Sequence, residues 1–121
     1  MTQTEYFAEF ERLCNEELEL TRLKNGDYAD SQDAFSNFKL IEEITAGRIT
    51  LEDGILCRIT DKLKRVAGLL KNPANVKEES LEDNLKDIAI YAKIWRIYRK
   101  ERLNICDKTV ARRDQRGNLH T

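Results

Sequence analysis

Three short segments of this chain carry the pattern that starts an α-helix. Each has a Ser or Thr followed three residues later by an acidic residue: Thr2-Gln3-Thr4-Glu5, Thr50-Leu51-Glu52-Asp53 and Ser80-Leu81-Glu82-Asp83. In this capping box the hydroxyl accepts a hydrogen bond from the backbone of the acidic residue, and the carboxylate accepts one in return. Apolar residues recur at helical spacing after each segment. The pattern predicts helices that begin near residues 2, 50 and 80.

The scarcity of helix-breaking residues favours an all-α chain. One Pro and five Gly in 121 residues are too few for the turns of a many-stranded fold. We expect helices near residues 2–25, 32–45, 50–70 and 80–103, with Gly26 and Gly47 ending the first two. The length fits one domain with a modest core. The sequence therefore predicts a four-helix bundle-like single domain in residues 1–103.

Residues 104–121 are polar, and we expect a flexible C-terminal tail there. The 22 acidic and 21 basic residues give a net charge of -1, which argues against nucleic acid as a partner. No apolar run approaches the roughly 18–20 residues of a membrane span, and no signal peptide is visible. Three scattered cysteines favour neither a zinc site nor a disulfide framework. These features predict a cytoplasmic protein without a membrane partner.

The helix expected over residues 80–103 is apolar on two sides. At about 100° per residue one face carries Leu81, Leu85, Ile88, Ala92 and Trp95, and another carries Ile90, Ile94, Ile97 and Tyr98. A helix of this kind is covered on one side by its own bundle and on the other by a second subunit. We therefore expect a homo-oligomer, either a dimer or a tetramer.

Two carboxylates, Asp83 and Asp87, interrupt an apolar stripe of that helix, because residues four apart lie on the same face. Covered carboxylates repel each other and lose hydration, and Mg²⁺ would offset both costs. The alternative is ordinary capping, with Asp83 in the capping box and Asp87 solvated in the second turn.

In the first helix Glu17 lies at the centre of an apolar stripe and Glu16 at its edge. Glu17 needs either a cation or a basic partner, for which we consider an Arg or Lys of the third helix.

Two further segments have both a functional and a structural interpretation. Arg58, Asp61, Lys62 and Arg65 could clamp a phosphate, although periodicity favours a solvated face with pairs such as Asp61 with Arg65. Lys24, Asn25, Asp27 and Tyr28 could contact a ligand, or they could simply end the first helix and form a turn.

These segments together resemble a known family. The order is Lys24-Asn25-x-Asp27-Tyr28, then Phe35-x-Asn37-Phe38, then Arg58-x-x-Asp61-Lys62-x-x-Arg65, then Glu79-Ser80-x-x-Asp83-x-x-x-Asp87-x-Ala89-x-Tyr91. It resembles the nucleotide modification associated domain 1 family of phage and prophage proteins. That family is similar to the MazG and dimeric dUTPase group of all-α nucleoside triphosphate pyrophosphohydrolases.

The resemblance implies a MazG-like, oligomeric helical bundle that binds a nucleotide in the host cytoplasm. It implies metal ligands at Glu16, Glu17, Asp83 and Asp87 for Mg²⁺ or Mn²⁺, with Glu17, Asp83 and Asp87 catalytic. The implied ligand-binding residues are Lys24, Asn25, Asp27, Tyr28, Arg58, Asp61, Lys62, Arg65 and Tyr91. The pyrophosphohydrolases carry a Glu-x-x-Asp pair where this chain has Asp83-x-x-x-Asp87.

Three functions follow as hypotheses. The first is Mg²⁺-dependent hydrolysis of a nucleoside triphosphate to the monophosphate and pyrophosphate. The second is a non-catalytic protein that sequesters a nucleotide or a nucleotide-derived immune signal. The third is an interaction module in which the two-sided last helix is only an oligomer interface.

Overall fold

Four helices account for nearly all of the described chain. The computed structural model describes residues 1–28, 33–72 and 78–115, with side chains described for residues 1–25, 33–72 and 80–106. The helices are α1 (Gln3–Tyr28), α2 (Ser36–Ile44), α3 (Leu51–Lys71) and α4 (Glu78–Gln115). The predicted all-α class is confirmed. In the described part of the chain, no helix is long and apolar enough to cross a membrane.

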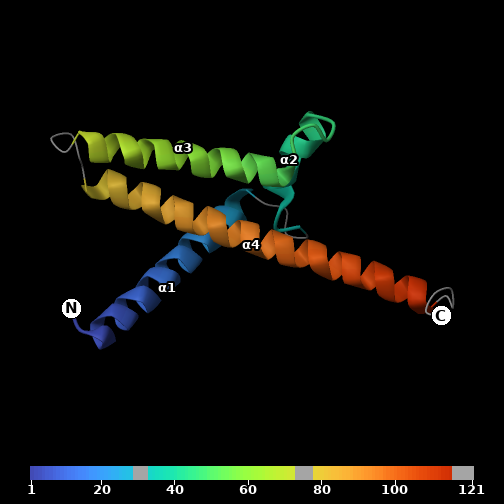
Figure 1. Ribbon diagram of the computed structural model, residues 1–121, viewed down its shortest axis with the longest axis horizontal. Helices are drawn as coiled ribbons and strands as arrows, with labels where there is room; N and C mark the ends of the chain where they lie inside the picture. Colours follow the sequence, from blue (N-terminus) through green and yellow to red (C-terminus); the bar gives the residue numbers. More distant parts are fainter. Residues whose placement is uncertain (29–32, 73–77, 116–121) are drawn as a thin grey trace.

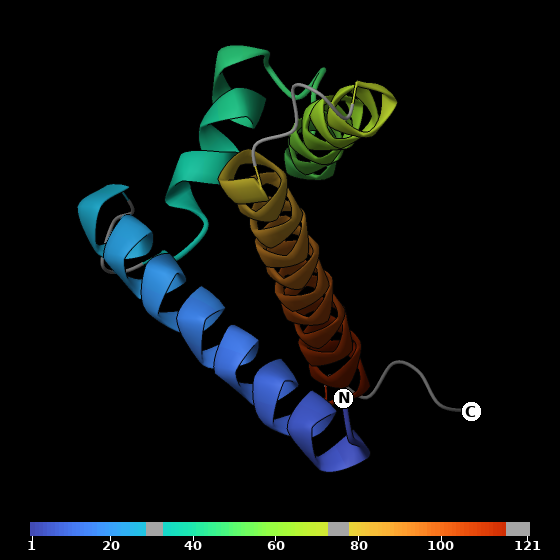
Figure 2. The same cartoon turned by 90° about the vertical axis from the view of Figure 1, so that its left-hand side faces the viewer.

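The helices differ in how closely they pack (Figure 1). Helices α3 and α4 run antiparallel and side by side, and they share the most extensive contact. The short α2 lies at the N-terminal end of α3. Helix α1 crosses α4 obliquely, so its N-terminal end and the C-terminal end of α4 project from the rest of the molecule (Figures 1 and 2).

Two of the three predicted capping boxes are present. The Thr2 nitrogen lies 2.8 Å from Glu5 Oε2, and the Glu5 nitrogen lies 3.2 Å from Thr2 Oγ1. At the start of α3 both reciprocal bonds between Thr50 and Asp53 measure 3.1 Å. The third prediction was wrong, because α4 already begins at Glu78. Two residues of the helix, Glu78 and Glu79, precede Ser80, so that residue lies inside the first turn and not at the N-cap.

The predicted helix ends are less accurate. Helix α1 continues through Gly26 to Tyr28, since one Gly costs a helix only about 1 kcal/mol relative to Ala. Helix α2 is shorter than residues 32–45, and Gly47 follows it with a φ of 81°. Helix α4 passes the expected end at Leu103 and reaches Gln115. No Gly or Pro interrupts residues 104–115, so polar composition alone does not end the helix.

The core is small and lies between α3, α4 and the segment that leads into α2. Its buried residues are Phe35, Leu51 and Ile55, at 8%, 1% and 0% exposure. The ring of Phe35 meets the ring of Tyr98 edge to face at 5.5 Å. In contrast, none of the described side chains of α1 is buried. Packing of apolar side chains therefore stabilises the α3–α4 pair much more than it stabilises the position of α1.

Candidate ligand-binding site

A cavity of about 500 Å³ opens where all four helices approach one another. Its walls combine amides, cations and aromatic rings, which is the composition of a site for a polar, planar ligand. The lining residues are Thr21, Lys24, Asn25, Asn37, Phe38, Arg58, Asp87, Ile90, Tyr91 and Ile94. Residues that are distant in the sequence, on α1 and on the second half of the chain, thus share one cavity.

Arg58 forms a cationic wall of this cavity. Its guanidinium carbon lies 4.9 Å from the centroid of the Phe38 ring and 5.8 Å from that of Tyr91. Attraction between the cation and the two ring faces favours this position of the guanidinium. Its exposed donors remain available to an anionic group. The solvated-face interpretation therefore misses the packing of Arg58, which only the neighbouring helices could supply.

Lys62 and Asp87 form an ion pair across α3 and α4. Lys62 Nζ lies 2.9 Å from Asp87 Oδ2, and both side chains are about one-fifth exposed. The Asp87 carboxylate also lines the cavity, whereas Lys62 does not. Lys62 therefore lies behind Asp87 as seen from the cavity. Asp61 and Arg65 are exposed and are not among the lining residues. No ion pair joins these two residues in the described part of α3, so that predicted pair was wrong.

Helix α1 supplies the opposite wall. Lys24 and Asn25 line the cavity, one turn after Thr21. The predicted helix stop at Asn25-Gly26 was wrong, because α1 continues to Tyr28. The backbones of Asp27 and Tyr28 belong to α1, but their side chains lie outside the described residues.

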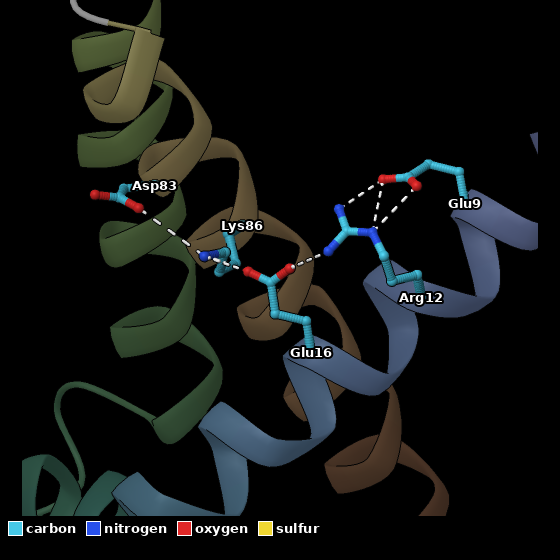
Figure 3. Close-up of polar contacts among 5 residues, drawn as sticks. All are labelled: Glu9, Arg12, Glu16, Asp83 and Lys86. Carbon is cyan, nitrogen blue, oxygen red and sulfur yellow. Dashed lines mark hydrogen bonds and ion pairs between the residues drawn. The ribbon is translucent and has the colours of Figure 1, made fainter.

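Two of the four predicted metal ligands, Glu16 and Asp83, lie in a separate network where α1 meets α4 (Figure 3). Glu16 Oε1 lies 2.6 Å from Lys86 Nζ, which is 4.0 Å from the exposed Asp83 carboxylate. Arg12 lies between Glu9 and Glu16, with its nitrogens 2.6 Å and 3.2 Å from their oxygens. The network is a chain of alternating charges along the α1–α4 contact.

Glu17 is the carboxylate that the sequence places within an apolar stripe. Its side chain is 14% exposed and forms an ion pair with Lys93. The partner therefore comes from α4 and not from the third helix, so that part of the structural interpretation was wrong. The expectation that Glu17 needs a compensating charge is consistent with this pair.

Hydrogen bonding shifts the pKa values of two residues in this network. The bond from Lys86 keeps the pKa of Glu16 below its ordinary value, and the bond to Glu16 raises the pKa of Lys86. Among the described residues, no three His, Cys, Asp or Glu side chains gather in a group suited to a metal ion. Asp83 is 74% exposed, and Glu16, Glu17 and Asp87 each face a lysine. Magnesium binding at these four acids stays a prediction.

Sequence reasoning missed part of the cavity. Thr21 gave no signal, and Phe38 was assigned no role in a ligand site. Asn37 appeared only within the segment Phe35-x-Asn37-Phe38. The side chains of Asn37 and Phe38 line the cavity because α2 packs at the N-terminal end of α3 (Figure 1). Only the spacing of that segment relative to Arg58 could have linked it to the site.

Comparisons with protein-family models, with curated proteins and with solved structures find no match to this chain. The function is therefore inferred from the residues and from their arrangement.

Proposed function

We propose that this protein binds a nucleotide in the four-helix cavity. The observation that carries the proposal is the pairing of two cations, Lys24 and Arg58, with two aromatic rings, Phe38 and Tyr91, in one cavity. Its volume of about 500 Å³ falls within the range of about 300–1,000 Å³ typical of small-molecule sites. A nucleotide presents both an anionic phosphate and a stacking base.

The lining residues suggest a division of roles. Arg58 presents several donors in a planar fork, which suits phosphate oxygens, and Lys24 adds a second positive charge. The ring of Tyr91 offers a face on which a base stacks. The amides of Asn25 and Asn37 carry both donors and acceptors, so they suit the edge of a base. Asp87, held by Lys62, accepts hydrogen bonds from a ligand hydroxyl or amine.

Binding without cleavage is the form that the described charges support best. The lysine partners of the predicted metal ligands already balance their charge, so a divalent cation would have to displace them. One observation favours magnesium-dependent hydrolysis as a second candidate. Asp87 lies on the cavity wall, and Mg²⁺ is often held by one or two carboxylates together with substrate phosphates. The donor set is incomplete in the described chain, so no hydrolytic step is assigned.

The test is calorimetric titration with nucleoside mono-, di- and triphosphates, with and without Mg²⁺ or Mn²⁺. We expect binding that persists without metal, with the ligand recovered intact by mass spectrometry. The Arg58→Ala variant should bind about 10- to 100-fold more weakly, because a charge-assisted contact is lost. Lys64→Ala, an exposed change on the same helix, is the matched control.

The outcomes distinguish the two candidates. Release of pyrophosphate that requires metal, and that Asp87→Asn abolishes, would replace the sequestration proposal with hydrolysis. If no nucleotide binds, both proposals fail, and the interaction-module hypothesis remains. We further propose that the MazG-like bundle is completed by a homo-oligomer, and that the protein acts in the cytoplasm of a phage-infected cell, as the resemblance implies.

A further inference from the structure

The projecting ends of α1 and α4 leave large apolar side chains uncovered. Every residue from 1 to 12 is exposed, including Tyr6, Phe7 and Phe10 at 54%, 59% and 58%. The ring of Tyr6 lies beside the rings of Phe7 and Phe10, with ring centroids 5.6 Å and 6.4 Å apart. Toward the C-terminal end of α4, Leu103 and Ile105 are 59% and 55% exposed. A cluster of exposed aromatic side chains such as that on α1 marks an interaction site.

The solvent-accessible surface of the chain is larger than that of a compact monomer of the same mass. It is 9843 Å² for a chain of 14.1 kDa, whereas a compact monomer of that mass exposes about 6,700 Å². The excess is about 3,000 Å² by the same relation. A standard interface buries about 800 Å² on each partner. The uncovered surface is therefore large enough for a stable dimer.

A shallow groove, formed by residues of α4 alone, lies beside the contact of α4 with α3 and suits the aromatic side chains of α1. The groove has a volume of about 510 Å³ and is lined by Ala92, Trp95, Arg96, Arg99, Lys100 and Leu103. Its floor is apolar and its rim is basic. Arg99 pairs with Glu52 inside the chain. Arg96 and Lys100 have no ion pair with any described residue, so their charges are available to a partner.

The charges of the two projecting ends are opposite. Residues 1–19 contain six glutamates and one Arg, whereas residues 93–103 contain five basic residues and one glutamate. Glu11 has no ion pair among the described residues, and it lies beside Phe10 on the exposed part of α1. An acidic helix with an aromatic stripe thus complements a basic groove with an apolar floor.

We propose that a second copy of this chain covers these surfaces, with the N-terminal half of α1 from each copy seated in the α4 groove of the other. The two contacts are related by a two-fold axis, which closes the assembly as a symmetric dimer. Phe7 and Phe10 fill the groove beside Trp95. Glu11 meets Arg96 and Lys100 at its rim. The inference does not depend on a nucleotide being the ligand of the cavity.

Sedimentation and light scattering of the full chain test this proposal through charge reversal. We expect a species of twice the 14.1 kDa chain mass for the wild type. The Arg96→Glu/Lys100→Glu variant and the Glu11→Arg variant should each weaken the dimer at least about tenfold, because like charges then meet across the contact. Combining all three changes should restore the dimer. Lys64→Glu, an exposed reversal on α3, is the matched control and should remain dimeric.

Circular dichroism separates a lost interface from a lost fold, because a dissociated but folded variant retains its helical signal. Fluorescence of Trp95, the only tryptophan, should shift on dissociation as the groove is exposed to water. A monomeric wild type would overturn the proposal. So would a dimer that survives both charge reversals, because its interface would then lie elsewhere.

Discussion

Helix α4 contacts α3 on one side and α1 on another, and the two contacts differ in physical kind. Against α3 it buries apolar side chains around Leu51 and Ile55, which are 1% and 0% exposed. Against α1 the named polar contacts are ion pairs, Glu16 with Lys86 and Glu17 with Lys93. Buried apolar area contributes about 25 cal/mol per Å², whereas these ion pairs are partly exposed, so they contribute less and are screened by salt. The α3–α4 pair is therefore the stable unit, and α1 is the adjustable wall of the cavity.

The largest expected effect is on the apolar contact. Ile55→Ala removes a fully buried side chain from the α3–α4 contact, so it should lower the free energy of unfolding by about 2–5 kcal/mol. Urea denaturation followed by circular dichroism measures this change. Leu56→Ala, next to it on α3 but at 49% exposure, should cost much less. Equal effects would show that the α3–α4 core is not the stable unit.

A polar contact within the same stable unit comes next. Glu52 accepts a hydrogen bond from Trp95 Nε1 at 2.6 Å, and it also meets Arg99 and Arg102. Glu52→Ala leaves the indole donor without this acceptor, which should cost about 1–3 kcal/mol in the free energy of unfolding. Thermal unfolding would reveal the loss. Glu43→Ala, an exposed change on α2, should leave the midpoint near that of the wild type.

The same carboxylate gives the α3–α4 contact a pH dependence. The bond from Trp95 holds the pKa of Glu52 below its ordinary value of 4.5. Because the folded state then binds the proton less readily than the unfolded state, this stabilisation is fully present above pH 4.5 and is lost as the pH falls through the folded pKa. The difference in thermal midpoint between the wild type and Glu52→Gln should therefore shrink on acidification. A difference that grows in acid would contradict the assignment.

The smallest effect on global stability is expected at the α1–α4 contact. Lys86→Ala removes the partner of Glu16, and added salt weakens the same attraction in the wild type. Either change should barely alter the thermal midpoint while making α1 more susceptible to limited proteolysis. Arg22→Ala, which disrupts a pair internal to α1, is the matched control. If α1 is cleaved at the same rate in both variants, the ion pairs between α1 and α4 do not position α1.

Much of the candidate site was predictable, but its geometry was not. The ordered segments around Lys24, Arg58 and Tyr91 named side chains that line one cavity. Periodicity placed Arg58 on a solvated face, because one helix considered alone does not show which ring from another helix reaches it. The pairing of Lys62 with Asp87 was missed for the same reason, since it joins helices whose relative register is fixed by the core.

The sequence by itself determined the helical class and two of the helix starts, because a capping box is satisfied within four consecutive residues. It placed helix ends less well, since a single Gly or a polar stretch lowers helix propensity without excluding the helix. Only the tertiary structure decided which charges meet across α1, α3 and α4. Packing of Leu51 and Ile55 sets the relative position of α3 and α4, and that position determines which side chains face the cavity and which lysine faces each carboxylate.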